Sequence, residues 1–107
     1  KKDMLLVNGI NVYPRELEEV IYQFDGIKEA AVIGINDPRK GDMVVACVAP
    51  IEGATIEDAA LLGFLKDKLA AYKLPRKVMQ MENLPRNATG KILKTKLREI
   101  ADEQFGR

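Results

Sequence analysis

The residues with the clearest chemical potential lie in a short polar loop that ends in a lysine. The loop spans residues 84–91 and reads LPRNATGK, so a proline and a glycine shape it and Lys91 follows its tip. A lysine ammonium is a compact point charge that suits phosphate or carboxylate oxygens. Lys91 is therefore a candidate functional cation, and the alternative is an ordinary solvated surface lysine.

A Gly-Lys pair is also the core of the phosphate-binding P-loop, but the neighbouring positions do not fit that motif. A P-loop requires a glycine five residues before its final glycine, and Ser or Thr after its lysine. Pro85 and Ile92 stand at those two positions. The sequence therefore excludes a P-loop.

The residue types that are absent exclude other chemistries. The chain has no histidine, so neither a Ser–His or Cys–His nucleophile pair nor an imidazole metal site can form. Its one cysteine, Cys47, lies in an apolar run at residues 43–48 and is expected to be a buried strand thiol. We therefore expect no disulfide and no metal site within this chain.

The 107 residues suit a single domain, whose net charge is only +1. Charge is nevertheless distributed unevenly along the chain. Residues 1–65 carry 6 basic and 11 acidic side chains, whereas residues 66–98 carry 10 basic and 2 acidic ones. This distribution suggests a face that meets anions, and nucleic acid is one possible partner. The chain has 3 Phe and 3 Tyr, of which only Tyr72 lies in the basic segment, so it offers little for stacking bases.

Turn signals and hydrophobic periodicity predict the elements of the first half. Asn8-Gly9 between two short apolar runs predicts a hairpin of residues 3–7 and 10–13. Pro14 suits the first position of a helix that ends at Gly26. Apolar, β-branched runs at residues 29–35 and 43–49 predict two strands buried on both faces of a sheet.

The second half reads as helix, strand, loop and helix. Thr55 resembles the cap of a helix whose inward stripe would be Leu62, Leu65, Leu69 and Tyr72. A short strand is expected at residues 77–81, and a last helix at residues 93–105. The predicted fold class is α+β, a small and mostly antiparallel sheet with an N-terminal β-hairpin, flanked by three helices.

Two long motifs resemble those of the adenylate-forming, or AMP-binding, acyl-CoA synthetases. Residues 1–18, KKDMLLVNGINVYPRELE, are similar to the hinge-proximal motif of that family. Residues 84–93, LPRNATGKIL, are similar to its final motif, which carries the catalytic lysine. Residues 37–42 and 72–75 fall where the family has similar segments. The resemblance covers essentially the whole chain.

The resemblance implies that residues 1–107 are the small, mobile C-terminal domain of such a ligase, without its N-terminal adenylation domain. The whole enzyme would convert a carboxylic acid and Mg·ATP to an acyl-adenylate and pyrophosphate. The small domain would then rotate, and coenzyme A would take the acyl group as a thioester. ATP and Mg²⁺ would be bound mainly by the N-terminal domain, and the isolated chain is expected to be inactive.

The same resemblance implies roles for individual residues. Lys91 matches the lysine that contacts the carboxylate and the α-phosphate during adenylation, and Lys2 matches the hinge. Asn8 stands where the family often has the first of two glycines. The residues implied in binding coenzyme A or shaping the catalytic loop are Asn8, Gly9, Ile10, Lys40, Tyr72, Arg76, Lys77, Thr89 and Gly90.

The Tyr13-Pro14 version of the first motif is closer to bacterial medium- and long-chain fatty-acyl-CoA ligases than to peptide-synthetase domains. No run approaches the roughly 20 apolar residues of a membrane span, so a cytoplasmic enzyme is expected. The alternative function is a free-standing basic module that binds nucleotides or nucleic acid. Acetylation of Lys91 would remove its charge, which adds a possible regulatory role.

Overall fold

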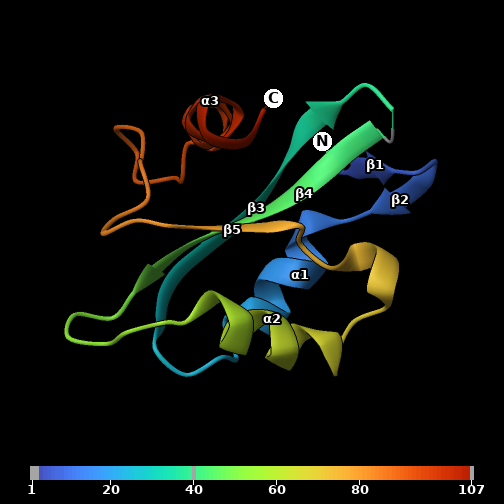
Figure 1. The fold of residues 1–107 in the computed structure, drawn as a ribbon. Coiled ribbons are helices and arrows are strands. Elements are labelled where there is room, and N and C mark those ends of the chain that lie inside the picture. Colours follow the sequence, from blue (N-terminus) through green and yellow to red (C-terminus); the bar gives the residue numbers. More distant parts are fainter. Residues whose placement is uncertain (1–2, 40, 107) are drawn as a thin grey trace.

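A computed structural model describes residues 3–39 and 41–106 as an open sheet with helices on both faces (Figure 1). Within these residues no helix is long and apolar enough to cross a bilayer. The elements, in chain order, are β1 (Leu5–Val7), β2 (Ile10–Val12), α1 (Pro14–Ile21), β3 (Ile27–Asp37), β4 (Gly41–Pro50), α2 (Asp58–Lys66), the 3₁₀ turn η1 (Ala71–Lys73), β5 (Lys77–Gln80) and α3 (Lys94–Phe105).

Strand β4 is paired along both of its edges. On one edge it forms a long antiparallel ladder with β3, from Asp37↔Gly41 to Ile27↔Pro50. On the other edge, β1 meets its beginning at Val7↔Gly41, and β5 runs parallel to it from Val45↔Lys77 to Val48↔Gln80. The sheet is therefore mostly antiparallel, as predicted, with one parallel pair.

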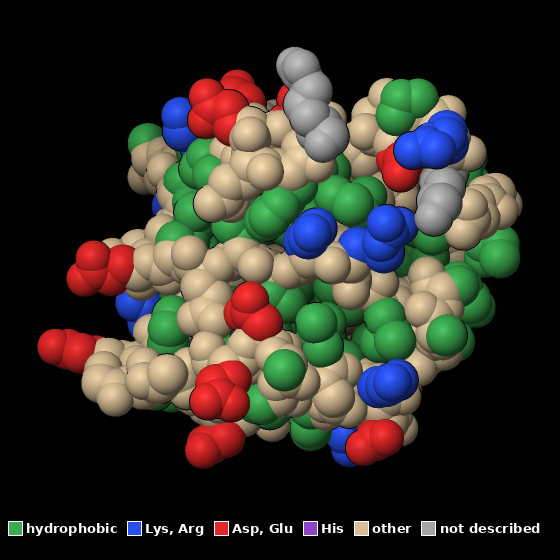
Figure 2. Space-filling model, viewed as in Figure 1, with side chains coloured by type: hydrophobic (Ala, Val, Ile, Leu, Met, Phe, Trp, Pro, Cys, Tyr) green, Lys and Arg blue, Asp and Glu red, His purple; other side chains and the backbone are tan. Residues whose placement is uncertain are grey.

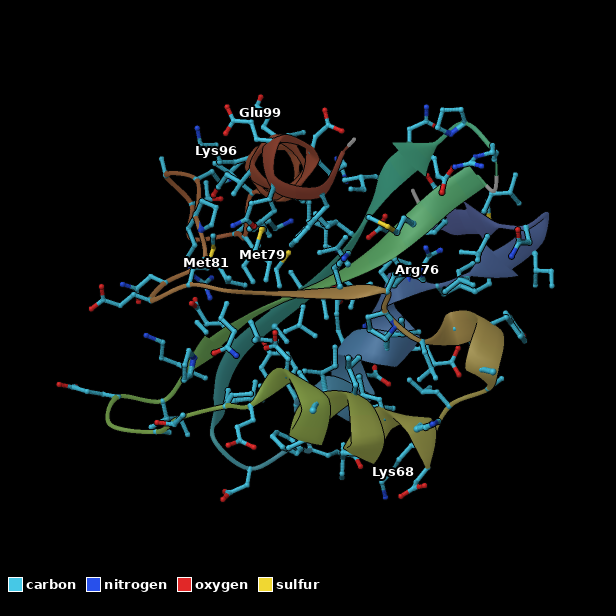
Figure 3. The ribbon with its side chains drawn as sticks, in the orientation of Figure 1. Lys68, Arg76, Met79, Met81, Lys96 and Glu99 are labelled. Carbon is cyan, nitrogen blue, oxygen red and sulfur yellow. The ribbon has the colours of Figure 1, made fainter. Side chains whose placement is uncertain are left out.

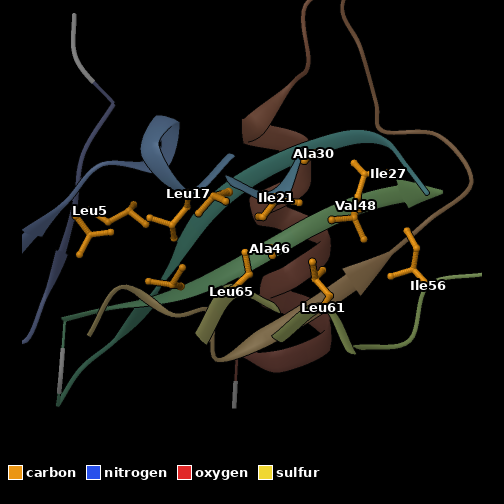
Figure 4. Close-up of a cluster of buried hydrophobic side chains, with 13 residues drawn as sticks. Leu5, Leu17, Ile21, Ile27, Ala30, Ala46, Val48, Ile56, Leu61 and Leu65 are labelled. Carbon is orange, nitrogen blue, oxygen red and sulfur yellow. The ribbon is translucent and has the colours of Figure 1, made fainter. Parts of the chain in front are cut away.

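The two faces of the sheet carry separate hydrophobic clusters. One contains Leu17 and Ile21 of α1 and Leu61 and Leu65 of α2, packed against alternate residues of β3 and β4 (Figure 4). The other contains Leu97 and Ala101 of α3, packed against the intervening strand residues. Figure 1 accordingly shows α1 and α2 on one side of the strands and α3 on the other. The predicted α+β class, with three helices flanking the sheet, is confirmed.

The N-terminal hairpin turns at the predicted Asn-Gly pair. Asn8 has φ 51° and Gly9 has φ 80°, so both occupy the left-handed region that this type of tight turn requires. Among non-glycine residues, asparagine is well suited to that region. Asn8 thus reproduces the backbone shape that glycine would adopt at this position.

The predicted second helix begins later and ends sooner than expected. Thr55 does not cap it, because the helix begins at Asp58 and Glu57 occupies the cap position without a side-chain bond. The Gln80 side-chain amide holds this start by donating to Ile56 O (2.7 Å) and Asp58 Oδ1 (2.8 Å). The predicted stripe is also wrong at Tyr72, which lies in the separate η1 turn and is 42% exposed.

Side chains of α1 and of Tyr22, which directly follows it, cover part of the free edge of β3. The Tyr22 hydroxyl accepts the Ala30 N–H at 3.0 Å, and Glu18 Oε2 accepts the Val32 N–H at 2.9 Å. Glu18 also pairs at 2.7 Å with Lys94 of α3, whose ammonium donates to Asp3 at 2.5 Å. Burial acts to lower the Lys94 pKa, but these two carboxylates outweigh it and raise that pKa. The Ala30 and Val32 N–H groups are therefore already bonded and cannot pair with another strand.

Cys47 lies at the centre of β4 and is fully buried. Burial raises the pKa of its thiol to about 12, because the apolar surroundings disfavour a thiolate. The prediction of a buried strand thiol is confirmed.

Alanine substitutions at Gly41 and Gly63 should have opposite effects on the stability of the chain. Gly41 has φ +88°, and an added Cβ would lie 2.6 Å from the Leu6 carbonyl oxygen, so Gly41→Ala should destabilise the chain by about 1–3 kcal/mol. Gly63 lies within α2 with open space around it, so Gly63→Ala should stabilise by about 0.5–1 kcal/mol. Urea unfolding of both variants measures the difference. Equal effects of the two alanines would contradict the turn geometry at Gly41.

Candidate functional site

The loop that carries Lys91 is closed by backbone hydrogen bonds. The Asn87 N–H donates to Lys91 O at 2.9 Å, and the Leu93 N–H donates to Pro85 O at 2.8 Å. Arg86 and Ile92 form an antiparallel bridge between these two bonds. The loop therefore doubles back on itself between β5 and α3, and its shape is set before any ligand arrives.

Asn87 organises the tip of this loop from the inside. Its side-chain oxygen Oδ1 accepts three hydrogen bonds, from Thr89 N (3.0 Å), Thr89 Oγ1 (2.8 Å) and Lys91 N (3.0 Å). Gly90 adopts φ +90°, a conformation that L side chains rarely reach, and its N–H donates to Asn87 O. Asn87 was not among the predicted site residues, although an Asn two residues before a Thr in a turn is a signal for this arrangement.

Lys91 is exposed at the end of this loop. No residue within 3–39 or 41–106 forms an ion pair or hydrogen bond with its ammonium. The loop thus fixes the backbone of Lys91 and leaves its positive charge available to an anion.

The loop is anchored to the sheet by the carboxylate of Glu29 in β3. Glu29 is only 9% exposed. Its Oε1 accepts the Leu84 N–H at 2.9 Å, and its Oε2 accepts Arg86 Nε at 2.9 Å and Arg86 Nη2 at 2.6 Å. Arg86 Nη1 donates to Gly90 O. Sequence reasoning missed both residues, and the only signal was one carboxylate in an otherwise apolar strand.

The electrostatics of Glu29 favour its charged form. Burial by itself raises the pKa of this carboxyl. The hydrogen bonds from Leu84 and Arg86, together with the charges of Arg86 and Lys28, outweigh that effect and hold the pKa below its ordinary value of 4.5. Glu29 is therefore an anion at neutral pH and a strong acceptor for the guanidinium.

A second candidate surface is a hollow of about 130 Å³ beside the hairpin. Its lining includes Asn8, Tyr72 and Arg76, three of the residues implied in binding coenzyme A, together with Val7, Asp42, Val44, Ala71 and Leu74. Tyr72 is held in place because its neighbour Lys73 pairs with Glu16 of α1 at 2.9 Å. The Arg76 N–H donates to Val44 O at 2.8 Å, which fixes that residue where the chain enters β5 (Figure 3).

The other predicted site residues lie elsewhere. Gly9 is in the hairpin turn and Ile10 begins β2; neither lines the hollow, and Ile10 is 44% exposed. The Lys77 ammonium lies over the Phe105 ring of α3, 5.6 Å from its centroid, and does not face the hollow. Lys2 and Lys40 lie outside the described residues.

The sheet places the two candidate surfaces at opposite ends. Strand β5 runs parallel to β4. Just before β5, the Arg76 N–H donates to Val44 O near the beginning of β4, and just after β5, the Met81 N–H donates to Val48 O near its end. The hollow therefore lies at the beginning of β4 and the Lys91 loop follows its end. Figure 1 shows residues 84–91, in orange, at the opposite end of the sheet from η1 and β1.

The basic segment does not form a uniform anion-binding face. Lys73, Arg86 and Lys94 pair with carboxylates of the acidic first half. On the face in Figure 2, Lys and Arg side chains are interspersed with Asp and Glu. This arrangement gives the nucleic-acid alternative no support, because the charges of these three residues are already neutralised within the chain.

Comparison with known proteins places this architecture in a family. Residues 16–91 match the AMP-binding enzyme C-terminal domain, and Lys91 is the last residue matched. The long-chain-fatty-acid–CoA ligase FadD13 of Mycobacterium tuberculosis is 45% identical over 92% of this chain and 19% of its own length. The indoleacetate–CoA ligase of Aromatoleum aromaticum is 41% identical over 94% of this chain and 20% of its own length.

The solved structures agree with this assignment. Apo MatB from Rhodopseudomonas palustris superposes with a TM-score of 0.92 at 41% identity, covering 97% of this chain and 21% of that chain. The chain belongs to the family of AMP-binding enzyme C-terminal domains. It spans about one fifth of the length of the curated relatives it matches.

The lowered pKa of Glu29 predicts how stability depends on pH. The folded-state pKa of Glu29 lies below the unfolded value near 4.5. The contribution of its charged form to the free energy of unfolding is therefore fully present above that pH. It is lost as the pH falls through the lower folded-state value. Glu29→Gln should therefore reduce the free energy of unfolding by about 1.5–3 kcal/mol at neutral pH and by progressively less in acid. Urea unfolding from about pH 7 to about pH 3 measures this difference; a difference independent of pH would contradict the assignment.

Proposed function

We propose that this chain is the mobile C-terminal domain of an AMP-forming ligase that joins a fatty acid to coenzyme A, and that an N-terminal adenylation domain precedes it in the whole enzyme. One observation carries the proposal: Lys91 is exposed at the end of a pre-shaped loop, inside the segment that the family covers, and its ammonium has no partner within residues 3–39 and 41–106. The relatives named as CoA ligases, one of them for long-chain fatty acids, support the reaction class.

In the first half-reaction, a carboxylate oxygen of the acid attacks the α-phosphorus of ATP, and pyrophosphate leaves with the electrons of the broken P–O bond. Two anions must approach each other, and negative charge accumulates on the α-phosphate. An ammonium held beside both groups stabilises that charge without being transferred or consumed. Lys91 has the exposure and the freedom from ion pairs within residues 3–39 and 41–106 that this role needs.

In the second half-reaction, the thiol of coenzyme A attacks the acyl carbon, the C–O bond to AMP breaks, and the thiol proton is lost to solvent. The hollow lined by Asn8, Tyr72 and Arg76 suits the nucleotide end of coenzyme A, since it offers an aromatic ring and a guanidinium. Gly9, Ile10, Lys40 and Lys77 remain predicted contacts from the resemblance.

The placement of the two surfaces supports a rotation between the half-reactions. The Lys91 loop and the hollow lie at opposite ends of the sheet, so the domain presents these two surfaces in different directions. Lys2 is the proposed hinge, at which backbone torsions would absorb the rotation. Each orientation would then expose one surface to the N-terminal domain.

ATP and Mg²⁺ are assigned mainly to the N-terminal domain. Within residues 3–39 and 41–106, no three His, Cys, Asp or Glu side chains lie where they could hold a metal ion. Mg²⁺ would neutralise phosphate charge when bound, while this chain would contribute Lys91 and part of the coenzyme A site. The proposed location is the cytoplasm, where both ATP and coenzyme A are available.

Replacing Lys91 by alanine in the full-length enzyme should separate the half-reactions. Adenylation should fall by about 10²–10³-fold, because the charge on the α-phosphate loses its stabilising cation. Thioester formation from supplied acyl-adenylate should stay within about twofold. ATP–pyrophosphate exchange measures the first step, using whichever of octanoate, dodecanoate and palmitate reacts fastest, and thioester release from the matching acyl-adenylate measures the second.

Lys96→Ala is the matched control, because Lys96 is another exposed lysine, near the start of α3, and its ammonium lies 3.9 Å from a carboxylate oxygen of Glu99 (Figure 3). This control should leave both rates unchanged. Equal loss of both half-reactions in Lys91→Ala would overturn the assigned role, and no exchange with any of the three acids would overturn the fatty-acid assignment. The isolated 107-residue chain should form no acyl-adenylate.

Restricting the hinge should slow thioester formation and leave adenylation intact, the opposite of the effect expected for Lys91→Ala. Lys2→Pro fixes one backbone torsion, so the rotation toward the coenzyme A orientation should be hindered while adenylation proceeds. Lys2→Ala keeps the torsional freedom and removes only the side chain. We expect thioester formation to slow by about tenfold or more in the proline variant relative to the alanine variant. Unchanged thioester formation in both would place the hinge elsewhere.

A further inference from the structure

A continuous chain of polar contacts joins the sheet to the peptide group of Lys91. It begins at Glu29 of β3, whose Oε2 accepts both Arg86 Nε (2.9 Å) and Arg86 Nη2 (2.6 Å). It continues from Arg86 Nη1 to Gly90 O. That carbonyl belongs to the peptide bond between Gly90 and Lys91, so the guanidinium acts directly on the backbone that carries the lysine.

The same carboxylate holds both arms of the loop. Glu29 Oε1 accepts the Leu84 N–H at 2.9 Å, at the start of the loop. Arg86 links Glu29 Oε2 to the Gly90 carbonyl oxygen at the tip. Leu84 is itself 3% exposed and packs in the α3-side cluster. Glu29 therefore fixes the start and the tip of the loop relative to β3, which the long ladder with β4 keeps in place.

Arginine is chemically required for this arrangement. A guanidinium presents five N–H donors in a planar fork, so it can bind a carboxylate through one edge and still donate to a carbonyl. A lysine at position 86 would supply one compact charge, which could pair with Glu29 but could not also hold Gly90 O in the same geometry. The buried position of Glu29, 9% exposed, makes the anchoring end of the pair rigid.

We propose that Glu29 and Arg86 are positioning residues that aim Lys91 at the reacting phosphate during adenylation. This inference rests on the proposed function of Lys91. Neither residue touches substrate in this scheme; Arg86 acts through the Gly90–Lys91 peptide, and Glu29 acts through Arg86. A displacement of about 1 Å in a catalytic group can cost on the order of 10²-fold in rate, so such a support affects the chemical step.

The test uses Arg86→Lys in the full-length enzyme, in which the charge is retained and the fork is lost. We expect kcat for adenylation to fall about 10- to 100-fold with little change in KM for ATP, because Lys91 is present but mispositioned. Thioester formation from supplied acyl-adenylate should stay within about twofold. Glu29→Gln should show the same selectivity, measured by ATP–pyrophosphate exchange with the acid chosen as above.

Ile33→Val is the stability control. It removes one methylene from a buried position of the same strand, at a cost of about 0.5–1.5 kcal/mol. Ile33 packs in the same cluster as Leu84, but its substitution leaves the hydrogen bonds of Glu29, Arg86 and Gly90 in place. If lost stability alone explained the Arg86 effect, Ile33→Val would lower adenylation as well. We expect it to leave both half-reactions unchanged.

A double-mutant cycle decides whether Arg86 acts through Lys91. In a Lys91→Ala background, Arg86→Lys should cause no further loss of adenylation, because the group that it positions is gone. Additive losses would overturn the inference, as would an unaffected kcat in Arg86→Lys. If Lys91→Ala itself leaves adenylation intact, the proposed function fails instead, so the two failures are distinguishable.

Discussion

The pairing of β4 along both edges is the constraint on which the rest of the structure depends. Its residues Val44 to Ala49 are buried on both faces, so they contribute alternately to the two hydrophobic clusters. Each helix packs against one of those clusters, and β1, β3 and β5 all take their positions from β4 hydrogen bonds. The direction of β5 then decides which end of the domain receives the hollow and which receives the lysine loop.

Features that depend on neighbouring residues could be predicted from the sequence. The Asn8-Gly9 turn, the helix that begins at Pro14 and the helix toward Phe105 are encoded by local spacing and backbone preferences. The second helix was predicted less well. Gln80, more than 20 residues away, and the burial of Ile56 decide where it begins, and no local pattern reports them.

The candidate site divides in the same way. Lys91 stands out because its loop motif is contiguous in sequence. Glu29 and Arg86 lie 57 residues apart and meet only because β3 passes beneath the loop, so neither could be found by spacing. The hollow draws its lining from the hairpin, the start of β4 and the η1 turn. Three-dimensional proximity of this kind requires the strand order, which sequence patterns alone did not supply.

The uneven charge of the chain acquires a different meaning in the folded state. The basic segment supplies Lys73, Arg86 and Lys94 to acidic partners in the first half, and each pair joins elements that are distant in sequence. These partly buried pairs therefore specify how the elements that they join sit relative to one another. Lys91 differs from these three because it is exposed and its ammonium has no ion pair within residues 3–39 and 41–106.

The burial of Cys47 also bears on product fidelity. An acyl-adenylate is a reactive electrophile, and the proposed reaction depends on its capture by the thiol of one particular co-substrate. A surface cysteine would be a second acceptor in the same molecule, and its attack would leave the protein acylated on itself. Enclosed in β4 with a pKa of about 12, the single thiol of this chain is both inaccessible and protonated at physiological pH. In the proposed reaction, the thiol of this chain therefore does not compete with coenzyme A for the activated acyl group.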